Sequence, residues 1–341
     1  MKLRYRWMRC LIRMMCIILM LFAATQAISL TLKIGTLAPV DTPWDAALRK
    51  LAVSWKDISG GKVELKIYGG GIAGDEADML RKMRIGQLDG AALTGTGLNR
   101  VSQELLTFSL PMFFESYEEI EYVMKNSTDE FRAIVEQKGI ILVAWSTAGW
   151  VRFFGKRPIR TADDLRSQRI SVSAEDEEIL QTWRSMGFDA IPLHTTELMA
   201  GLQSGMVEAY HTPALIAAVY QWFALTPYMS SLNIAPLIVG LVMGERSWRK
   251  VPEEYREPFM EAAFDVLEPL FREVEVLEQE AMDVMLAFGL TVNDPDEQAL
   301  AEWLELVETS YDNLIGTSIS PEVFESVKKL RDGYREANEN K

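Results

Sequence analysis

Cysteine and histidine are scarce in this chain, with two of each among 341 residues, so little material is available for thiol, disulfide or metal chemistry. Cys10 and Cys16 both lie within the first 27 residues, and no cysteine follows them. His194 and His211 are too few for a zinc site, which needs three or four convergent ligands. We therefore expect no reactive thiol or disulfide in the folded protein, no metal and no cofactor.

Acidic residues are absent from residues 1–27, and long apolar runs are absent from the rest of the chain. Five lysines and arginines precede an apolar run at 14–24, and Thr-Gln-Ala at 25–27 follows it. This order is typical of a signal peptide that is cleaved after Ala27. The run is shorter than the roughly 20 residues of a spanning helix, which disfavours an uncleaved membrane anchor. We therefore expect residues 1–27 to be a signal peptide and the mature chain to be periplasmic.

Basic residues are too few to balance the acidic ones, since 35 lysines and arginines face 49 aspartates and glutamates for a net charge of −14. Cleavage of the basic signal peptide makes the mature chain more acidic still. Such a chain repels nucleic acids and anionic lipid surfaces, so we expect no nucleic-acid partner. Residues 28–341 are also too many for one compact core, which favours two lobes.

Strand-like and helix-like patterns alternate along most of the chain, which predicts an α/β fold with a mainly parallel sheet. We expect a helix from Thr42, which caps it, to Ser59. A long helix is expected at 252–288, with a bend at Pro269. The remaining strands are expected at 30–37, 63–68, 90–94, 140–146 continuing to 154, 169–172, 190–193 and 207–210. The remaining helices are expected at 75–85, 175–186 and 195–203, with a short helix starting at 162–165, a helical segment from Pro213 and shorter acidic helices at the end of the chain.

Motifs of known enzyme chemistry are weak. Gly69–Gly74 matches G-x-G-x-x-G, the turn that can hold a dinucleotide pyrophosphate. The preceding strand is not the first of the chain, and the next strand ends at Thr94, where an acidic residue would hold a ribose. We therefore interpret this segment as a turn that directs a helix amino end toward a cleft. No G-x-S-x-G elbow is present, and we expect a protein that is not an enzyme.

Several short motifs occur in a characteristic order along the mature chain. They are Gly60–Leu65 with Gly69–Asp75, Met83–Asp89, Phe108–Phe114, Arg157–Ile159 with Asp164–Leu165, Arg169–Val172, and Ala200–Glu208. Each motif alone is common. Together they resemble the DctP-type extracytoplasmic solute receptors of TRAP transporters, and the resemblance covers nearly the whole mature chain.

The resemblance implies a two-lobed fold of the periplasmic-binding-protein type, with a ligand cleft between lobes, two crossing hinge strands and a long bent helix that spans both lobes. The crossing strands would be Trp145–Phe154 and about 236–244. Lobe I would comprise 28–149 and about 240–268, and lobe II 150–239 and about 269–341. A small-molecule ligand would be trapped by hinge closure and passed to an ion-gradient-driven TRAP membrane permease. A periplasmic TPR-type helical-repeat protein is a further partner that the resemblance allows.

Three positions depart from the family pattern. The family's carboxylate-binding arginine is matched by Ser171, and a second, often basic, position by Val151. The neighbouring Arg152 points to the opposite face of its strand, because side chains alternate along a strand. Thr212 replaces a family asparagine. We therefore hypothesise a ligand that is neutral, apolar or amphipathic, unless a basic residue such as Arg152 or Arg184 takes over the role of the arginine.

The candidate ligand-binding residues combine these positions with aromatic side chains near the inferred cleft. They are Trp44, Phe113, Trp145, Trp150, Val151, Arg152, Ser171, Tyr210, Thr212 and Trp222. Any one of the aromatic residues could instead belong to the core. Two other classes of protein remain open at this point: a secreted hydrolase on a similar fold, and an interaction protein with a degenerate ligand site.

Overall fold

The computed structural model describes residues 29–174 and 177–338, and the predicted signal peptide lies outside these residues. The described chain forms one ten-stranded sheet, in which eight strands follow the order β2-β1-β3-β9-β4-β7-β5-β6 and β8 and β10 lie off this path. The strands are β1 (Leu30–Thr36), β2 (Val63–Tyr68), β3 (Gly90–Thr94), β4 (Ile140–Gly155), β5 (Ile170–Ser173), β6 (Ala190–Leu193), β7 (Ala209–Pro213), β8 (Tyr228–Ser230), β9 (Ala235–Gly244) and β10 (Thr291–Asn293).

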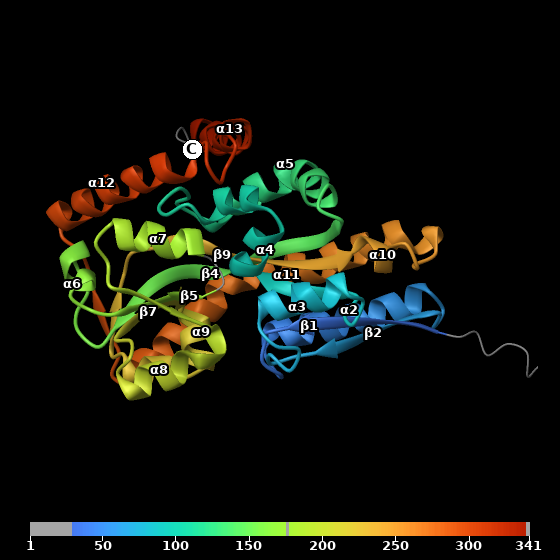
Figure 1. The fold of residues 1–341 in the computed structure, drawn as a ribbon, viewed down its shortest axis with the longest axis horizontal. Coiled ribbons are helices and arrows are strands. Elements are labelled where there is room, and N and C mark those ends of the chain that lie inside the picture. Colours follow the sequence, from blue (N-terminus) through green and yellow to red (C-terminus); the bar gives the residue numbers. More distant parts are fainter. Residues whose placement is uncertain (1–28, 175–176, 339–341) are drawn as a thin grey trace, which may run out of the picture.

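Helices cover both faces of the sheet (Figure 1). The α-helices are α2 (Pro43–Ile58), α3 (Glu76–Arg84), α4 (Gly95–Val101), α5 (Tyr117–Glu136), α6 (Ala162–Arg166), α7 (Glu177–Ser185), α8 (Leu198–Ser204), α9 (Ala214–Val219), α10 (Glu245–Trp248), α11 (Glu253–Ala287), α12 (Glu297–Leu314) and α13 (Pro321–Asn338). Three 3-10 helices are η1 (Gln103–Ser109), η2 (Thr195–Glu197) and η3 (Trp222–Leu225). Among the helices that the structure describes, none is both long and apolar enough to cross a bilayer.

The sheet divides into two lobes that share two central strands, as the sequence predicts. β2, β1 and β3 pair in parallel at one end, and β5 and β6 pair in parallel at the other. β9 pairs antiparallel with both β3 and β4, and the 16-residue β4 continues into pairing with β7. Figure 1 shows β4 and β9 running across the middle of the molecule. These are the crossing strands, so the predicted fold class is confirmed.

The long helix α11 connects the two lobes. Near its start the ring of Phe259 stacks on Trp55 of α2 with 4.3 Å between ring centroids, and the Trp55 indole nitrogen donates to the Phe259 carbonyl at 3.0 Å. Near its end Met285 is buried with Phe154 and Tyr210 of the other lobe. Pro258 and Pro269 both lie within this single helix.

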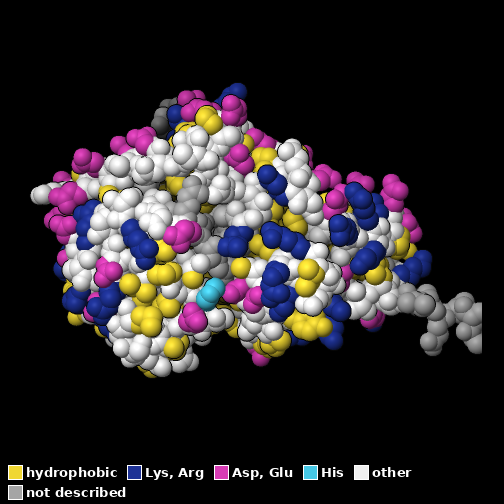
Figure 2. Space-filling view, viewed as in Figure 1, with side chains coloured by type: hydrophobic (Ala, Val, Ile, Leu, Met, Phe, Trp, Pro, Cys, Tyr) yellow, Lys and Arg dark blue, Asp and Glu magenta, His cyan; other side chains and the backbone are white. Residues whose placement is uncertain are grey.

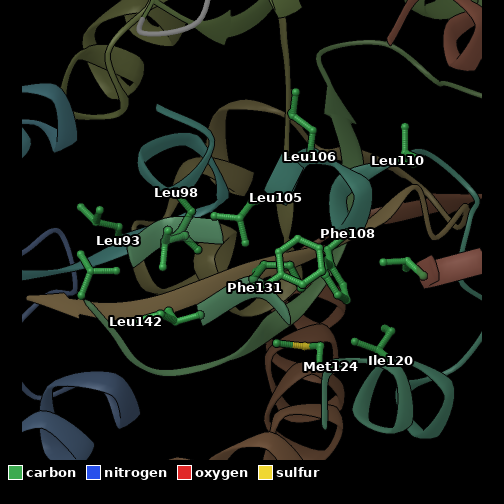
Figure 3. Close-up of a cluster of buried hydrophobic side chains, with 14 of the residues drawn as sticks. Leu93, Leu98, Leu105, Leu106, Phe108, Leu110, Ile120, Met124, Phe131 and Leu142 are labelled. Atoms are coloured by element: carbon green, nitrogen blue, oxygen red, sulfur yellow. The ribbon is translucent and has the colours of Figure 1, made fainter. Parts of the chain in front are cut away.

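The largest hydrophobic cluster lies between the sheet and a helix that the sequence patterns did not predict. This is the 20-residue α5, which is capped by Ser116 and buries Ile120, Met124 and Phe131. Phe108 packs edge-on against Phe131, with centroids 5.0 Å apart (Figure 3). It also packs edge-on against Trp145, with centroids 4.9 Å apart. α13 also lies against α5, so the end of the chain closes over this cluster.

Candidate ligand-binding cleft

A cavity of about 250 Å³ lies between the two lobes. Its wall includes the last residues of strands from both lobes, which is where open α/β sheets bind ligands. One lobe contributes Thr36 and Leu37 at the end of β1 and Thr94 at the end of β3. The other lobe contributes Ser171, Val172 and Ser173 of β5, Leu193 of β6, and His211, Thr212 and Pro213 of β7.

Contacts across the mouth of the cavity hold the two lobes together. The Tyr220 hydroxyl, which follows α9, donates to the carbonyl of Leu37 at 3.1 Å. His194 Nδ1 lies 3.1 Å from Asp75 Oδ2, and Figure 2 shows a histidine beside acidic side chains where the two halves meet. The structure therefore has the lobes in contact around the cavity.

The segment Gly69–Gly74 forms a turn at this junction, as the sequence analysis suggested. Gly74 has φ +94°, and a Cβ atom there would lie 2.6 Å from the Asp78 carboxylate, so the turn requires glycine. The next residue, Asp75, caps α3 by accepting from the Asp78 amide and also faces His194. The helix amino end is thus occupied by the chain's own carboxylate.

The cavity wall is mainly apolar, and its charge is negative. Among the lining residues that the structure describes, Glu76 alone carries a formal charge, and no lysine or arginine lines the cavity. Glu76 is almost fully buried. Its carboxylate accepts from the Thr94 amide, the Thr94 hydroxyl and the Gly97 amide at 2.6, 2.9 and 2.7 Å. These bonds tie α3 to the end of β3, so Glu76 has a structural role in this wall.

Val151 and Arg152 point to opposite sides of β4, as strand alternation predicts. Val151 lines the cavity. Arg152 lies in a separate polar pocket, where its Nε donates to Asn233 at 3.1 Å and its Nη1 lies 3.7 Å from Glu278. The Arg152 guanidinium is therefore directed away from the cavity.

The other nearby arginines also have partners outside the cavity. Arg169 donates to the carbonyls of Met206 and Gly205 at 3.0 and 2.7 Å. Arg184 donates twice to the carbonyl of Ala190, at 3.3 and 3.2 Å. Neither Arg152 nor Arg184, the two substitutes that the sequence left open, lines the cavity.

The ten candidate residues fall into three groups in the structure. Six line the cavity: Trp44, Val151, Ser171, Tyr210, Thr212 and Trp222. Trp150 and Arg152 line the polar pocket around Glu278. Phe113 is buried against Tyr311 and Phe324, and Trp145 lies in the α5 cluster, where its indole nitrogen donates to Thr128 at 3.0 Å.

Several lining residues were not among the candidates. Leu37, Ile216, Val219, Tyr220 and His211 all contribute to the wall. Tyr220 lies two residues before the candidate Trp222, and their rings stack with centroids 4.6 Å apart. His211 was considered only as a metal ligand; among the described residues no group of three metal-binding side chains occurs.

The fold and the cleft define a two-lobed receptor for a small ligand. Residues 34–317 match the DctP family model, bacterial extracellular solute-binding protein family 7, and the chain belongs to this family. The predicted resemblance is therefore confirmed: this is a DctP-type periplasmic solute-binding protein of the TRAP class. Its relatives are solute receptors rather than enzymes, which supports a role in transport.

Curated relatives are distant but extend over most of the chain. A solute-binding protein of Roseobacter denitrificans is 22% identical over 250 residues, which covers 73% of this chain and 76% of the relative. The sialic acid-binding periplasmic protein SiaP of Vibrio cholerae is 19% identical over 302 residues, covering 87% of this chain and 93% of that protein.

Solved structures show the same fold. A TRAP periplasmic solute-binding protein of Chromohalobacter salexigens with bound d-glucuronate has a TM-score of 0.80 and 22% identity, covering 88% of this chain and 99% of that one. The sugar acid-binding protein DctPAm of Advenella mimigardefordensis in complex with galactonate has a TM-score of 0.83 and 17% identity, covering 89% and 98%.

Proposed function

We propose that this protein captures a neutral, apolar or amphipathic ligand by closure of its two lobes and delivers it to a TRAP membrane permease. The observation that carries the proposal is the cavity wall, to which the described residues contribute no lysine or arginine. We further propose that the six lining candidates, Trp44, Val151, Ser171, Tyr210, Thr212 and Trp222, contact the ligand. Nothing among the described residues points to a TPR-type partner, and the proposal leaves it out.

An anionic ligand would be disfavoured in this cavity for two reasons. A carboxylate that leaves water needs a cationic or hydrogen-bonding partner, and a buried arginine pair is worth about 2–5 kcal/mol, or roughly 30- to 4,000-fold in affinity. Among the described lining residues, Glu76 alone carries a formal charge, and an ionised Glu76 would repel a second carboxylate. The d-glucuronate and galactonate in the two related structures are carboxylates, so the proposed ligand differs in charge from theirs.

The mechanism uses the shared strands as hinges. We propose the lobe boundaries that the sequence suggests, 28–149 with about 240–268 and 150–239 with about 269–341. Opening would then bend the chain in β4, β9 and α11, which connect the lobes. Contacts such as Tyr220 to Leu37 exist only when the lobes meet, so a ligand that fills the cavity shifts the protein toward the closed state.

Native mass spectrometry of residues 28–341 purified from a bacterial periplasm tests the ligand class. We expect an extra mass that is released on denaturation and belongs to an uncharged molecule with apolar groups. A bound sugar acid or other small carboxylate would contradict the proposal.

A charge-restoring variant tests the same idea without knowledge of the ligand. Ser171→Arg introduces a cation into the wall, and we expect it to gain at least about tenfold in affinity for d-galacturonate or succinate over the wild type, measured by calorimetry. Ser185→Arg is the matched control, because it adds the same charge at an exposed position on α7. Strong binding of these acids by the wild type would count against the proposal.

A further inference from the structure

A second cavity of about 220 Å³ lies behind the first, on the α7 and α12 side of the sheet. The first cavity is called the near chamber below, and the second the far chamber. Phe153 of β4, Trp183 of α7 and Leu306 of α12 line the far chamber. No charged side chain of the described residues lines it. The far chamber is therefore even less suited to an ion than the near one.

The two chambers meet at a common wall, called the waist. Both are lined by the same six residues: Thr96, Val151, Val172, Ser173, His211 and Leu237. These residues come from α4, β4, β5, β7 and the hinge strand β9, so the waist lies where the two lobes and the hinge come together. None of the six carries a formal charge, so the wall shared by the two chambers holds no fixed ion.

His211 is a polar group of the waist with a buried ring nitrogen that makes no hydrogen bond to a described residue. Its ring stacks on Trp183 with centroids 5.5 Å apart and meets Phe153 edge-on, so its position is fixed by packing. Nδ1 is buried without a partner, and no hydrogen bond joins either ring nitrogen to a described residue. Burial lowers the pKa of His211 to about 4, so the ring is neutral at neutral pH.

We propose that the cleft takes an elongated, uncharged ligand, with one apolar group in each chamber and a hydroxyl or similar neutral polar group at His211. This inference rests on the proposed function and extends it to the shape of the ligand. A hydroxyl suits a neutral imidazole because it can both donate and accept, whichever ring nitrogen carries the proton.

The volumes agree with this shape. A cavity of about 150 Å³ lined by apolar side chains holds one benzene molecule. Each chamber exceeds that volume, so each can hold a ring or a short alkyl chain. A sugar-sized ligand would occupy the near chamber alone and leave the far chamber empty.

Straight-chain primary alcohols from butan-1-ol to dodecan-1-ol test whether one ligand uses both chambers. Each buried methylene contributes about 0.8 kcal/mol, or about fourfold in affinity at 1.4 kcal/mol per tenfold. We expect the wild-type affinity, measured by tryptophan fluorescence or calorimetry, to rise through the whole series. Leu306→Trp fills the far chamber from α12, and its affinities should stop rising at an intermediate length, at least about tenfold below wild type for dodecan-1-ol.

Two variants make this comparison specific. Leu304→Trp is the matched control, because Leu304 lies on the same helix but is 44% exposed and lines neither chamber. It should follow the wild type. Met186→Trp fills the far chamber from outside α12 and should reproduce Leu306→Trp, which keeps the test valid if either variant fails to fold.

Two failures are distinguishable in this series. If the wild type binds the alcohols but stops gaining affinity at the same length as Leu306→Trp, the far chamber is not used and the inference is overturned, while the proposed function stands. If no alcohol of any length binds the wild type, the proposed function itself fails.

Undecan-6-ol and undecan-1-ol test the role of His211. The first places its hydroxyl in the middle of the chain, at the waist, and we expect the wild type to prefer it. His211→Phe retains an aromatic ring against Trp183 but removes both nitrogens. We expect it to bind undecan-6-ol about fivefold more weakly, the effect of one net hydrogen bond, and undecan-1-ol as before. An equal effect on both alcohols would remove His211 from the proposal.

Discussion

Two regions beside β4 differ in charge. In the cleft, Val151, Ser171 and Thr212 border a cavity to which the described residues contribute no lysine or arginine. In the polar pocket, the Glu278 carboxylate of α11 is 4% exposed and accepts from the Tyr117 hydroxyl at 2.6 Å, the Trp150 amide at 3.0 Å and the Ala214 amide at 3.0 Å. We call the groups around Glu278 the hinge cluster. The Ser171 and Thr212 hydroxyls of the cleft wall make no hydrogen bond to a described residue. In the hinge cluster, the Glu278 carboxylate accepts three hydrogen bonds.

The buried charges around Glu278 make contacts within the protein and do not line the cleft. The hinge cluster joins α5, β4, α9 and α11, and β4 and α11 are two of the elements proposed to bend when the lobes open. Gly149 leaves room for it: its φ is +115°, and a Cβ atom there would lie 2.6 Å from the Glu278 carboxyl carbon. Burial and the adjacent carboxylate raise the pKa of Tyr117, so its hydroxyl remains a donor. The buried Glu278–Arg152 pair therefore lies outside the cleft, whose wall is mainly apolar.

Glu278→Ala should produce the largest effect. It leaves the Arg152 guanidinium without its ion-pair partner, and the Tyr117 hydroxyl and two buried amides without their acceptor. Breaking a buried ion pair in this way costs about 3–5 kcal/mol. We expect a fall of that size in the free energy of unfolding, measured by urea denaturation.

The control for this change lies on the same helix. Glu280→Ala removes an exposed carboxylate and should cost less than about 0.5 kcal/mol. Equal losses in the two variants would show that the hinge cluster is no more important than the surface of α11.

The pH dependence of His211 should be the next largest effect. Its pKa is about 4 in the folded protein and about 6.5 when unfolded, so the unfolded chain binds more protons between these values. Stability therefore falls as the pH drops from about 6.5 to 4, by about 2 kcal/mol once the ring surface open to the cavities is considered. His211→Phe should lack this part of the loss, as seen in urea denaturation at pH 7 and pH 4.5. If the wild type and His211→Phe lose the same stability between pH 7 and pH 4.5, His211 does not cause the loss.

Much of the fold followed from local sequence signals. The strands at 63–68, 90–94 and 190–193 have the predicted bounds, because turns and helix caps delimit each of them. The strand predicted at 207–210 begins two residues later, since Gly205 is left-handed and the Val207 amide still bonds to the Gly201 carbonyl. The predicted helix at 175–186 begins at Glu177 in the described residues. The 20-residue α5 was not among the predicted helices, although it is capped by Ser116 and amphipathic.

The lining residues that lie on strands could be predicted from the alternation of side chains and the positions of the strand ends. Alternation along β4 separates Val151 from Arg152, and the ends of β5 and β7 place Ser171 and Thr212 at the cavity. The sequence does not predict which aromatic residues line the cavity, because residues of the core and residues of a cavity wall recur at the same intervals along the chain. Trp145 lies in the core and Trp222 on the wall for reasons that only the tertiary packing reveals. Glu278 was missed because it lies among many solvent-facing acidic residues of α11.

Tyr220→Phe should affect closure more than stability. It removes the hydroxyl that bonds to the Leu37 carbonyl across the mouth of the cavity. One net hydrogen bond of about 1 kcal/mol is lost from the closed state, so the affinity for the trapped ligand should fall about fivefold. Calorimetric dissociation constants measure the change. Tyr228→Phe is the control, since no hydrogen bond joins its hydroxyl to a described residue, and an equal loss in that variant would disprove the closure role.

Ser171→Ala and Thr212→Val should have the smallest effect on stability, below about 0.5 kcal/mol by urea denaturation. The reason is that neither hydroxyl makes a hydrogen bond to a described residue, so its removal leaves no buried partner unsatisfied. Thr226→Val is the matched comparison, because the Thr226 hydroxyl is fully buried, donates to the Trp222 carbonyl at 3.1 Å and lies 3.3 Å from the Tyr210 hydroxyl. That variant should lose about 1–2 kcal/mol. If Thr212→Val costs as much as Thr226→Val, the cleft hydroxyls are structural, and the contrast between a bonded hinge and an unbonded cleft does not hold. If it costs little but weakens ligand binding, the cleft hydroxyls serve recognition.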